Sequence, residues 1–110
     1  MKNKKVLVLG AGPEHSAVFN KELSDHKLTF ETSSSAALRR AKSADVIAVH
    51  IDKHGGFLDE VINLGYSGGI VAIATSKRTI NKLLKFPNGV IVDPVSWGTA
   101  PHAIMRALAT

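Results

Sequence analysis

The sequence lacks cysteine and long hydrophobic runs, and each absence excludes a class of protein. None of the 110 residues is Cys, which rules out disulfides, thiolate catalysis and Cys-based zinc or iron–sulfur sites. The longest apolar runs, such as 6–9 and 70–74, are far shorter than the roughly 20 residues that a membrane helix needs. We therefore expect no membrane segment, no signal peptide and a cytoplasmic location.

Aromatic and acidic residues are also scarce. Aromatic residues make up 5% of the chain, and 14 Lys and Arg outnumber 9 Asp and Glu, which leaves a formal charge of +5. A positive surplus steers a protein toward acidic or phosphorylated partners, although it is also an ordinary solubility charge. Because no aromatic residues alternate with the basic ones for base stacking, we do not expect direct nucleic-acid binding. The 45% of hydrophobic residues is enough for one core, so we expect a single domain over residues 1–110.

Strand and helix patterns alternate five times along the chain. Short aliphatic runs, typical of strands covered on both faces, occupy residues 6–9, 28–30, 46–51, 70–74 and 90–92. Apolar residues at helical spacing follow each run: Phe19 with Leu23, Leu38 with Ala41, 57–58 with 61–62, Ile80 with 83–84, and Ile104 with 107–108. This order predicts an α/β, (βα)5 fold of the flavodoxin-like type. It is a three-layer sandwich around a parallel five-stranded sheet of order 2-1-3-4-5.

Helix ends carry the expected residues. Gly65 follows Leu64 as a C-terminal stop, and Thr99 and Pro101 precede the last helix as a cap and a first-turn proline. In the predicted topology, ligands bind where the strands end and the winding reverses. The segments to inspect are therefore 10–14, 50–54, 75–78 and 93–97.

The turn after the first strand offers an alternative function. Gly10-Ala11-Gly12 resembles the opening of a dinucleotide fingerprint, in which glycines let the backbone approach a pyrophosphate. The third glycine is missing, and Glu31 lies only near the place of the ribose-binding acid. A small nucleotide- or phosphate-binding domain that uses this turn remains the alternative to the function developed below.

Two other patterns suggest chemistry. His50, Asp52 and His54 would face one side of a strand and could ligate a metal if the strand reached that far, but the following glycines indicate a turn. We therefore favour structural roles, with His50 in the polar rim of the sheet and His54 solvated, and expect no metal and no cofactor.

Residues of the hydrolase-triad types also occur near the C-terminus. Ser96, His102 and Asp93 supply these types without a GxSxG motif, so Ser96 is interpreted as a loop or capping residue. We assign no catalytic residue and do not expect an enzyme.

Several local sequences resemble the receiver domain of bacterial response regulators (the CheY-like superfamily) over nearly the whole chain. They are Lys5-Val6-Leu7-Val8-Leu9, Asp45-Val46-Ile47-Ala48-Val49-His50, the stretch 64–75, and Asp93-Pro94. In that family an acidic pair after strand 1 holds magnesium and an Asp ending strand 3 accepts a phosphoryl group. A Thr or Ser after strand 4 and a Lys after strand 5 complete the site.

The functional positions of the family are largely replaced in this chain. Gly10 and Ala11 stand where the acidic pair would be, and neither offers a side-chain oxygen to a hard cation. His50 stands at the phosphoacceptor position, and Asp52 comes two residues too late for it. Asp93 replaces the Lys, and only Thr75, or Ser76, keeps the expected type. The resemblance therefore indicates a degenerate pseudo-receiver that cannot be phosphorylated in the usual way.

Such a resemblance implies a role in signal transduction or transcription regulation through protein contacts or dimerisation. Domains of this kind are often the N-terminal part of a longer regulator. The family's contact face, formed by helix 4, strand 5 and helix 5, would carry Lys77, Arg78, Lys82, Lys85, Trp97 and His102. A basic rim around one aromatic anchor favours an acidic partner and salt-sensitive association.

Two further hypotheses concern single side chains at the sheet's carboxyl edge. Trp97 is either a contact anchor or a cover for the end of the sheet. Asp93 would lie near His50, so this pair is either a pH-sensitive switch or a structural hydrogen bond.

Overall fold

The structure is a computed structural model and describes residues 4–54, 56–76, 78 and 96–109. Its elements, in chain order, are β1 Lys5–Leu9, α1 Pro13–Glu22, β2 Lys27–Glu31, α2 Ser34–Ala41, β3 Val46–His50, α3 Ile51–His54, α4 Phe57–Asn63, β4 Gly69–Ile73 and α6 Ala100–Ala109. None of the helices in these residues is long and apolar enough to cross a membrane.

The strands form a parallel sheet of order β2-β1-β3-β4. Leu7 on β1 lies between Thr29 on β2 and Ile47 on β3, which fixes the register at the centre of the sheet. The parallel α/β sheet and the order 2-1-3-4 are thus confirmed. The predicted fifth strand at residues 90–92 and the predicted helix around Ile80 lie outside the described residues.

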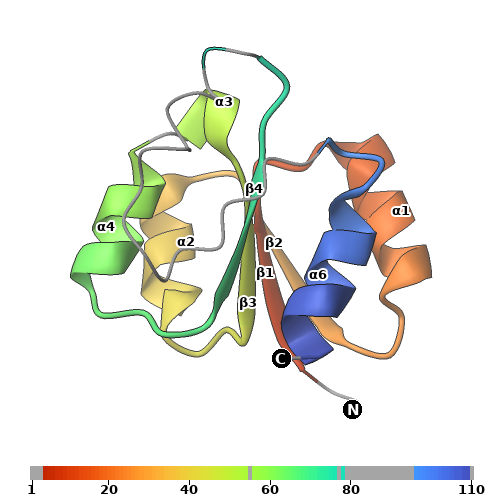
Figure 1. The fold of residues 1–110 in the computed structure, drawn as a ribbon, viewed down its shortest axis with the longest axis horizontal. Helices are drawn as coiled ribbons and strands as arrows, with labels where there is room; N and C mark the ends of the chain where they lie inside the picture. Colours follow the sequence, from red (N-terminus) through yellow and green to blue (C-terminus); the bar gives the residue numbers. More distant parts are fainter. Residues whose placement is uncertain (1–3, 55, 77, 79–95, 110) are drawn as a thin grey trace.

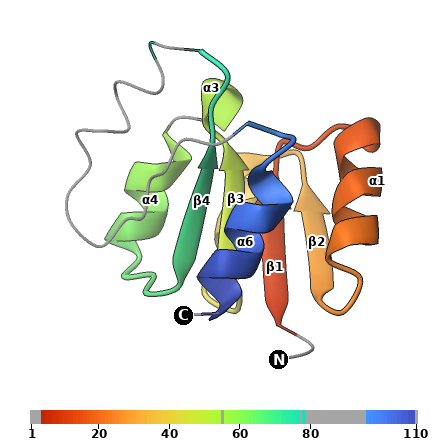
Figure 2. The same cartoon turned by 45° about the vertical axis from the view of Figure 1, so that its right-hand side comes forward.

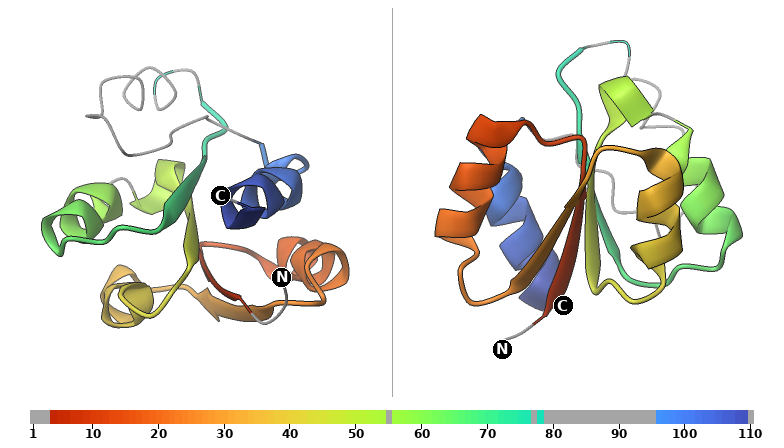
Figure 3. Two further views of the ribbon diagram at one scale, coloured as in Figure 1. Left: turned by 60° about the horizontal axis from the view of Figure 1, so that its bottom comes forward. Right: turned by 180° about the vertical axis from the view of Figure 1, so that it is seen from behind.

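Two layers of helices cover the sheet. Helices α2 and α4 lie on one face and α1 and α6 on the other (Figures 1 and 2). Alternate residues of β1 point to opposite faces, so Leu7 packs in the α2–α4 layer and Val8 in the α1–α6 layer. Figure 3 shows the same three layers from the end and from behind. Burial on both faces explains why the central strands read as continuous aliphatic runs.

Helix α4 ends as its sequence predicts. The Gly65 N–H donates to the Ile62 carbonyl at 2.9 Å, and the Tyr66 N–H donates to the Val61 carbonyl at 3.3 Å. Gly65 has a φ of +80°, so the two bonds form a Schellman motif, whose left-handed residue is most often glycine.

One predicted boundary is wrong. The run of residues 46–51 was expected to be strand throughout, but β3 ends at His50 and Ile51 begins the single turn α3. Ile51 is buried in either case, so hydrophobicity alone does not mark where the strand stops. This early turn decides the geometry of the candidate site.

Replacing Gly65 by Ala should lower the free energy of unfolding by about 1 kcal/mol, because an L-residue is strained at positive φ. Gly56 provides a matched control, since it precedes α4 at a φ of −73° and a Cβ there would meet nothing within 4 Å. Gly56→Ala should be neutral or stabilising by up to about 1 kcal/mol. Urea denaturation followed by Trp97 fluorescence measures both variants; equal losses would contradict the assigned cap.

Candidate functional site

The carboxyl ends of β1, β3 and β4 meet at one edge of the sheet, at the top of Figure 1. Gly10 follows β1, His50 ends β3, and Thr75 lies two residues beyond β4. In an open parallel sheet this edge is the expected location of a ligand or of chemistry. Three of the predicted positions are therefore on neighbouring strands of the same edge.

Gly10 and His50 approach each other too closely for a side chain at position 10. A Cβ built on Gly10 would lie 2.9 Å from the His50 Cβ and 3.2 Å from the His54 Cδ2. Gly10 also has a φ of +95°, a conformation that favours glycine. Its N–H donates to the Glu31 carbonyl at 3.0 Å, which fixes the turn. A carboxylate cannot occupy this position without displacing His50.

His50 is buried, with 9% of its surface exposed. Neither ring nitrogen has a hydrogen-bond partner among the described residues. Its Nε2 lies 3.3 Å from the Asp52 Oδ2, which is within ion-pair distance but lacks the alignment of a hydrogen bond. Protonation of the ring would make this contact an ion pair.

Asp52 connects α3 to the segment that follows β4. Its Oδ2 accepts hydrogen bonds from the Thr75 hydroxyl and, at 2.7 Å, from the Thr75 N–H. Its Oδ1 accepts from the Ser76 hydroxyl at 3.2 Å. The Asp52 side chain keeps 18% exposure. The sequence alignment places His50 at the acceptor position and Asp52 two residues later, and it does not predict the contact of Asp52 with Thr75. The position of Asp52 just after a buried strand is the only sequence signal for this contact.

The metal arrangement considered for His50, Asp52 and His54 does not form. It required these residues to share one face of a strand, whereas Asp52 and His54 belong to α3. In the part of the chain that the structure describes, no group of three His, Asp or Glu side chains is arranged to hold a metal ion.

His54, at the end of α3, contacts the first turn of α2. Its Nδ1 lies 3.1 Å from the Ser34 Oγ, within hydrogen-bond distance. Burial lowers the pKa of His54 below its ordinary value, and the neighbouring His50 and Lys53 lower it further. His54 is therefore a partly covered residue of the site and not the solvated one that the sequence suggested.

Trp97 packs over the end of the sheet. Its ring stacks on His15, with centroids 4.1 Å apart and planes 5° apart, and lies 5.1 Å from the His50 ring at 54°. The Phe19 ring is tilted against it, with the two ring centroids 6.0 Å apart. Trp97 is only partly exposed and packs against the core of the α1–α6 layer. These contacts favour the covering role over that of a free contact anchor.

Of the remaining candidate residues, some are described by the structure and some are not. Arg78 and His102 are exposed, whereas Lys77, Lys82, Lys85 and Asp93 lie outside the described residues. The hypotheses that involve Asp93, with His50 or in a triad, are therefore not tested. The Ser96 hydroxyl bonds the Thr99 hydroxyl at 3.2 Å, and the Ser96 carbonyl accepts from the Ala100 N–H at 3.0 Å. Ser96 thus lies in the loop before α6 and accepts a hydrogen bond from the first residue of that helix, which agrees with its interpretation as a loop or capping residue.

Solved structures resemble this arrangement over almost the whole chain. One is a response regulator receiver domain protein from Clostridium thermocellum, with a TM-score of 0.71, 18% identity, and coverage of 96% of this chain and 94% of that one. Another is the signal receiver domain of an HD domain-containing protein from Pseudomonas fluorescens Pf-5, with a TM-score of 0.71, 14% identity, and coverage of 98% and 96%.

The chain has the fold of a receiver domain. At the sequence level, no protein-family model and no curated protein matches the chain. The receiver fold thus rests on the arrangement of the elements, and the chemistry of its carboxyl edge must be argued from this chain's own residues.

His54 should make the receiver fold less stable in acid. Its folded-state pKa is lowered, so the unfolded chain binds more protons and stability rises with pH through that range. The part of the stability that depends on neutral His54 is present above its ordinary pKa of about 6.5 and is lost as pH falls below that value toward its lowered folded-state pKa. The denaturant midpoint of His54→Gln should fall less steeply with decreasing pH than that of the wild type. His102→Gln changes an exposed residue, so its midpoint should fall as steeply as that of the wild type. Identical slopes for the two variants would contradict this role.

Proposed function

We propose that this chain is an atypical receiver-like signalling domain, not an enzyme, that acts through protein contacts or dimerisation without aspartyl phosphorylation. The observation that carries the proposal is the close approach of Gly10 and His50, which leaves no room for an acidic residue at the end of β1. The cytoplasmic location and the place of the domain in a longer regulator stay predictions.

The residues at the carboxyl edge do not fit a magnesium ion. Gly10 and Ala11 have no side-chain oxygen, and hard divalent cations require oxygen ligands. The Asp52 oxygens already accept hydrogen bonds from Thr75 and Ser76. Phosphoryl transfer relies on a metal or a cation to neutralise the developing charge. A buried imidazole beneath Trp97 supplies neither the metal ligands nor a carboxylate acceptor.

The nucleotide-binding alternative gains little from the geometry. The Gly10 N–H is engaged by the Glu31 carbonyl, so it is not available to a phosphate. Glu14 also places a carboxylate oxygen 3.9 Å from a Cβ built on Gly12, where a phosphate would meet like charge. These contacts favour a turn over a phosphate cradle, and the alternative stays a prediction.

The outer face of α6 supports a role in protein contacts. His102, Met105 and Arg106 are exposed there, and with Thr99 and Ala109 they line a shallow depression. Met105 is one of three large hydrophobic residues that are exposed among the described residues, at 37%. An apolar centre with basic neighbours agrees with the acidic partner, or second copy, expected for this face.

Amide NMR with magnesium and beryllofluoride, a mimic of an acyl phosphate, tests the loss of phosphorylation. Because the metal ligands are missing, Gly10, His50, Asp52 and Thr75 should show no saturable shift. A joint, saturable shift of these four amides would restore a working phosphorylation switch and contradict the proposal.

Dimerisation through α6 is tested by sedimentation velocity over a range of concentrations. Met105→Asp should weaken self-association at least tenfold, since it would bury an unpaired charge in the interface. Leu64→Asp makes the same change at a residue that is 39% exposed after α4, in the other layer, and should have no effect. A wild-type chain that stays monomeric at every concentration, or equal effects of both variants, would contradict this contact face.

A further inference from the structure

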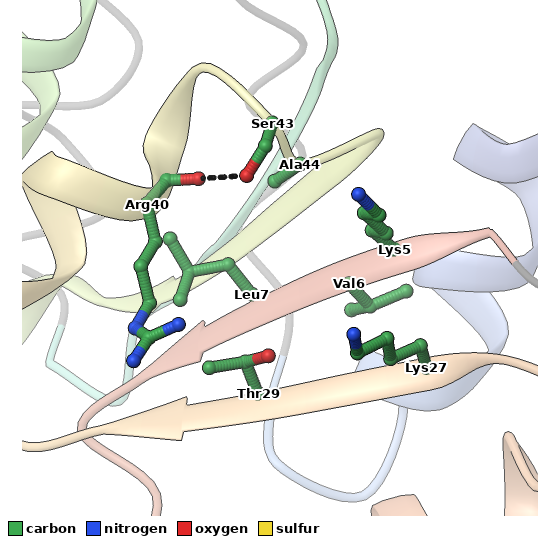
Figure 4. A pocket seen from close by; sticks show the side chains of 8 residues that line it. All are labelled: Lys5, Val6, Leu7, Lys27, Thr29, Arg40, Ser43 and Ala44. Atoms are coloured by element: carbon green, nitrogen blue, oxygen red, sulfur yellow. Dashed lines mark hydrogen bonds between the residues drawn. The ribbon is translucent and has the colours of Figure 1, made fainter.

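A pocket of about 200 Å³ lies at the amino end of the sheet, away from the candidate site. It opens between the last turn of α2 and the first halves of β1 and β2 (Figure 4). The lining residues are Lys5, Val6, Leu7, Lys27, Thr29, Arg40, Ser43 and Ala44. Leu7 is the lining residue of β1 nearest to the carboxyl edge, and two residues, or about 7 Å of strand, separate it from Leu9 at the end of β1.

The pocket collects positive charge. Lys5 and Lys27 are direct partners in the β1–β2 register, and like charges that face each other across strands are destabilising. Arg40 brings a third cation from α2, and the three basic side chains surround one space in Figure 4. None of the eight lining residues is acidic.

The nearest carboxylates offset only part of this charge. The Glu31 Oε2 lies 2.6 Å from the Arg40 Nε, and this pair holds the guanidinium in place. The Asp45 Oδ2 accepts the backbone N–H of Lys5 at 2.8 Å, and Asp45 does not line the pocket. If Glu31 offsets one of the three cations, two positive charges remain in the pocket.

The polar atoms of the pocket also suit an oxyanion. The Thr29 hydroxyl lies at the wall and can donate a hydrogen bond. Ser43 already donates to the Arg40 carbonyl at 3.0 Å, so it braces the end of α2 instead. Leu7 is 2% exposed and gives the pocket an apolar floor.

We propose that this pocket binds the phosphate group of a small phosphorylated molecule. A phosphate monoester carries about −1.5 to −2 charges at pH 7, which matches the two positive charges that Glu31 leaves. A carboxylate, with one charge, would leave one of them uncompensated. Charge-assisted hydrogen bonds from Lys and Arg are the usual means of holding such a group. This binding is independent of the function proposed for the carboxyl edge.

Titration of the isotope-labelled chain with inorganic phosphate at constant ionic strength tests the site. Saturable amide shifts are expected at Leu7, Thr29 and Ser43. Lys5→Ala and Lys27→Ala should each weaken binding about tenfold, because each removes one charge-assisted contact. Both side chains are exposed, so the variants should keep the dispersed spectrum of the fold.

Lys21→Ala is the matched control. Lys21 is exposed on α1, in the opposite helical layer, and its loss changes the net charge equally. Phosphate affinity should therefore be unchanged. An equal loss in this control, unsaturable shifts spread over the surface, or no shift at all would overturn the proposal. Binding of a short DNA duplex without any response to inorganic phosphate would overturn it in favour of a nucleic-acid contact.

Discussion

The pairing of β1 with β3 is the constraint on which the rest of the structure depends. Val6 to Leu9 are at most 2% exposed and Val46 to Val49 at most 1%, so both strands must be covered on both faces. Only helices on each side of the sheet can provide this cover for a parallel pair. The same pairing places the residues that follow β1 beside the end of β3. The layers and the location of the candidate site therefore have one cause.

At the carboxyl edge, this proximity brings aromatic and imidazole rings close to Gly10 and His50. Because Gly10 has no side chain, the His50 Cβ and the His54 ring can lie close to it. The Trp97 ring stacks on His15 and packs against the His50 ring. Asp52 turns toward Thr75, which ties α3 to the end of β4. Within the described residues, Asp52 links α3 to the segment after β4, and no three His, Asp or Glu side chains are arranged to hold a metal ion. The proposed function is based on these two features.

The two ends of the sheet differ in chemistry because different side chains are left uncovered there. The carboxyl edge is closed by Trp97 and the histidines, whereas the last turn of α2 leaves Lys5 and Lys27 open to solvent at the amino end. Lys5 and Lys27 face each other in this second place, and Arg40, which pairs with Glu31, lines the same pocket. A binding role at the amino end would therefore not interfere with contacts made through α6.

The sequence by itself determined the first four strands, their parallel sheet and the stop at Gly65, because each is encoded in neighbouring residues. Continuous aliphatic runs indicate strands that are buried on both faces, and a glycine directly after the end of a helix indicates a left-handed turn. It also placed Gly10, His50 and Thr75 at one edge, since strand ends in a parallel sheet coincide. Only the tertiary structure decided that Ile51 begins a helix, because a buried residue fits a strand and a helix equally well. The tertiary structure also decided which residues come into contact: Asp52 with Thr75, and Trp97 with His15. It likewise placed Lys5, Lys27 and Arg40 around one pocket. Such contacts depend on register and on the path of the loops, which no local pattern records.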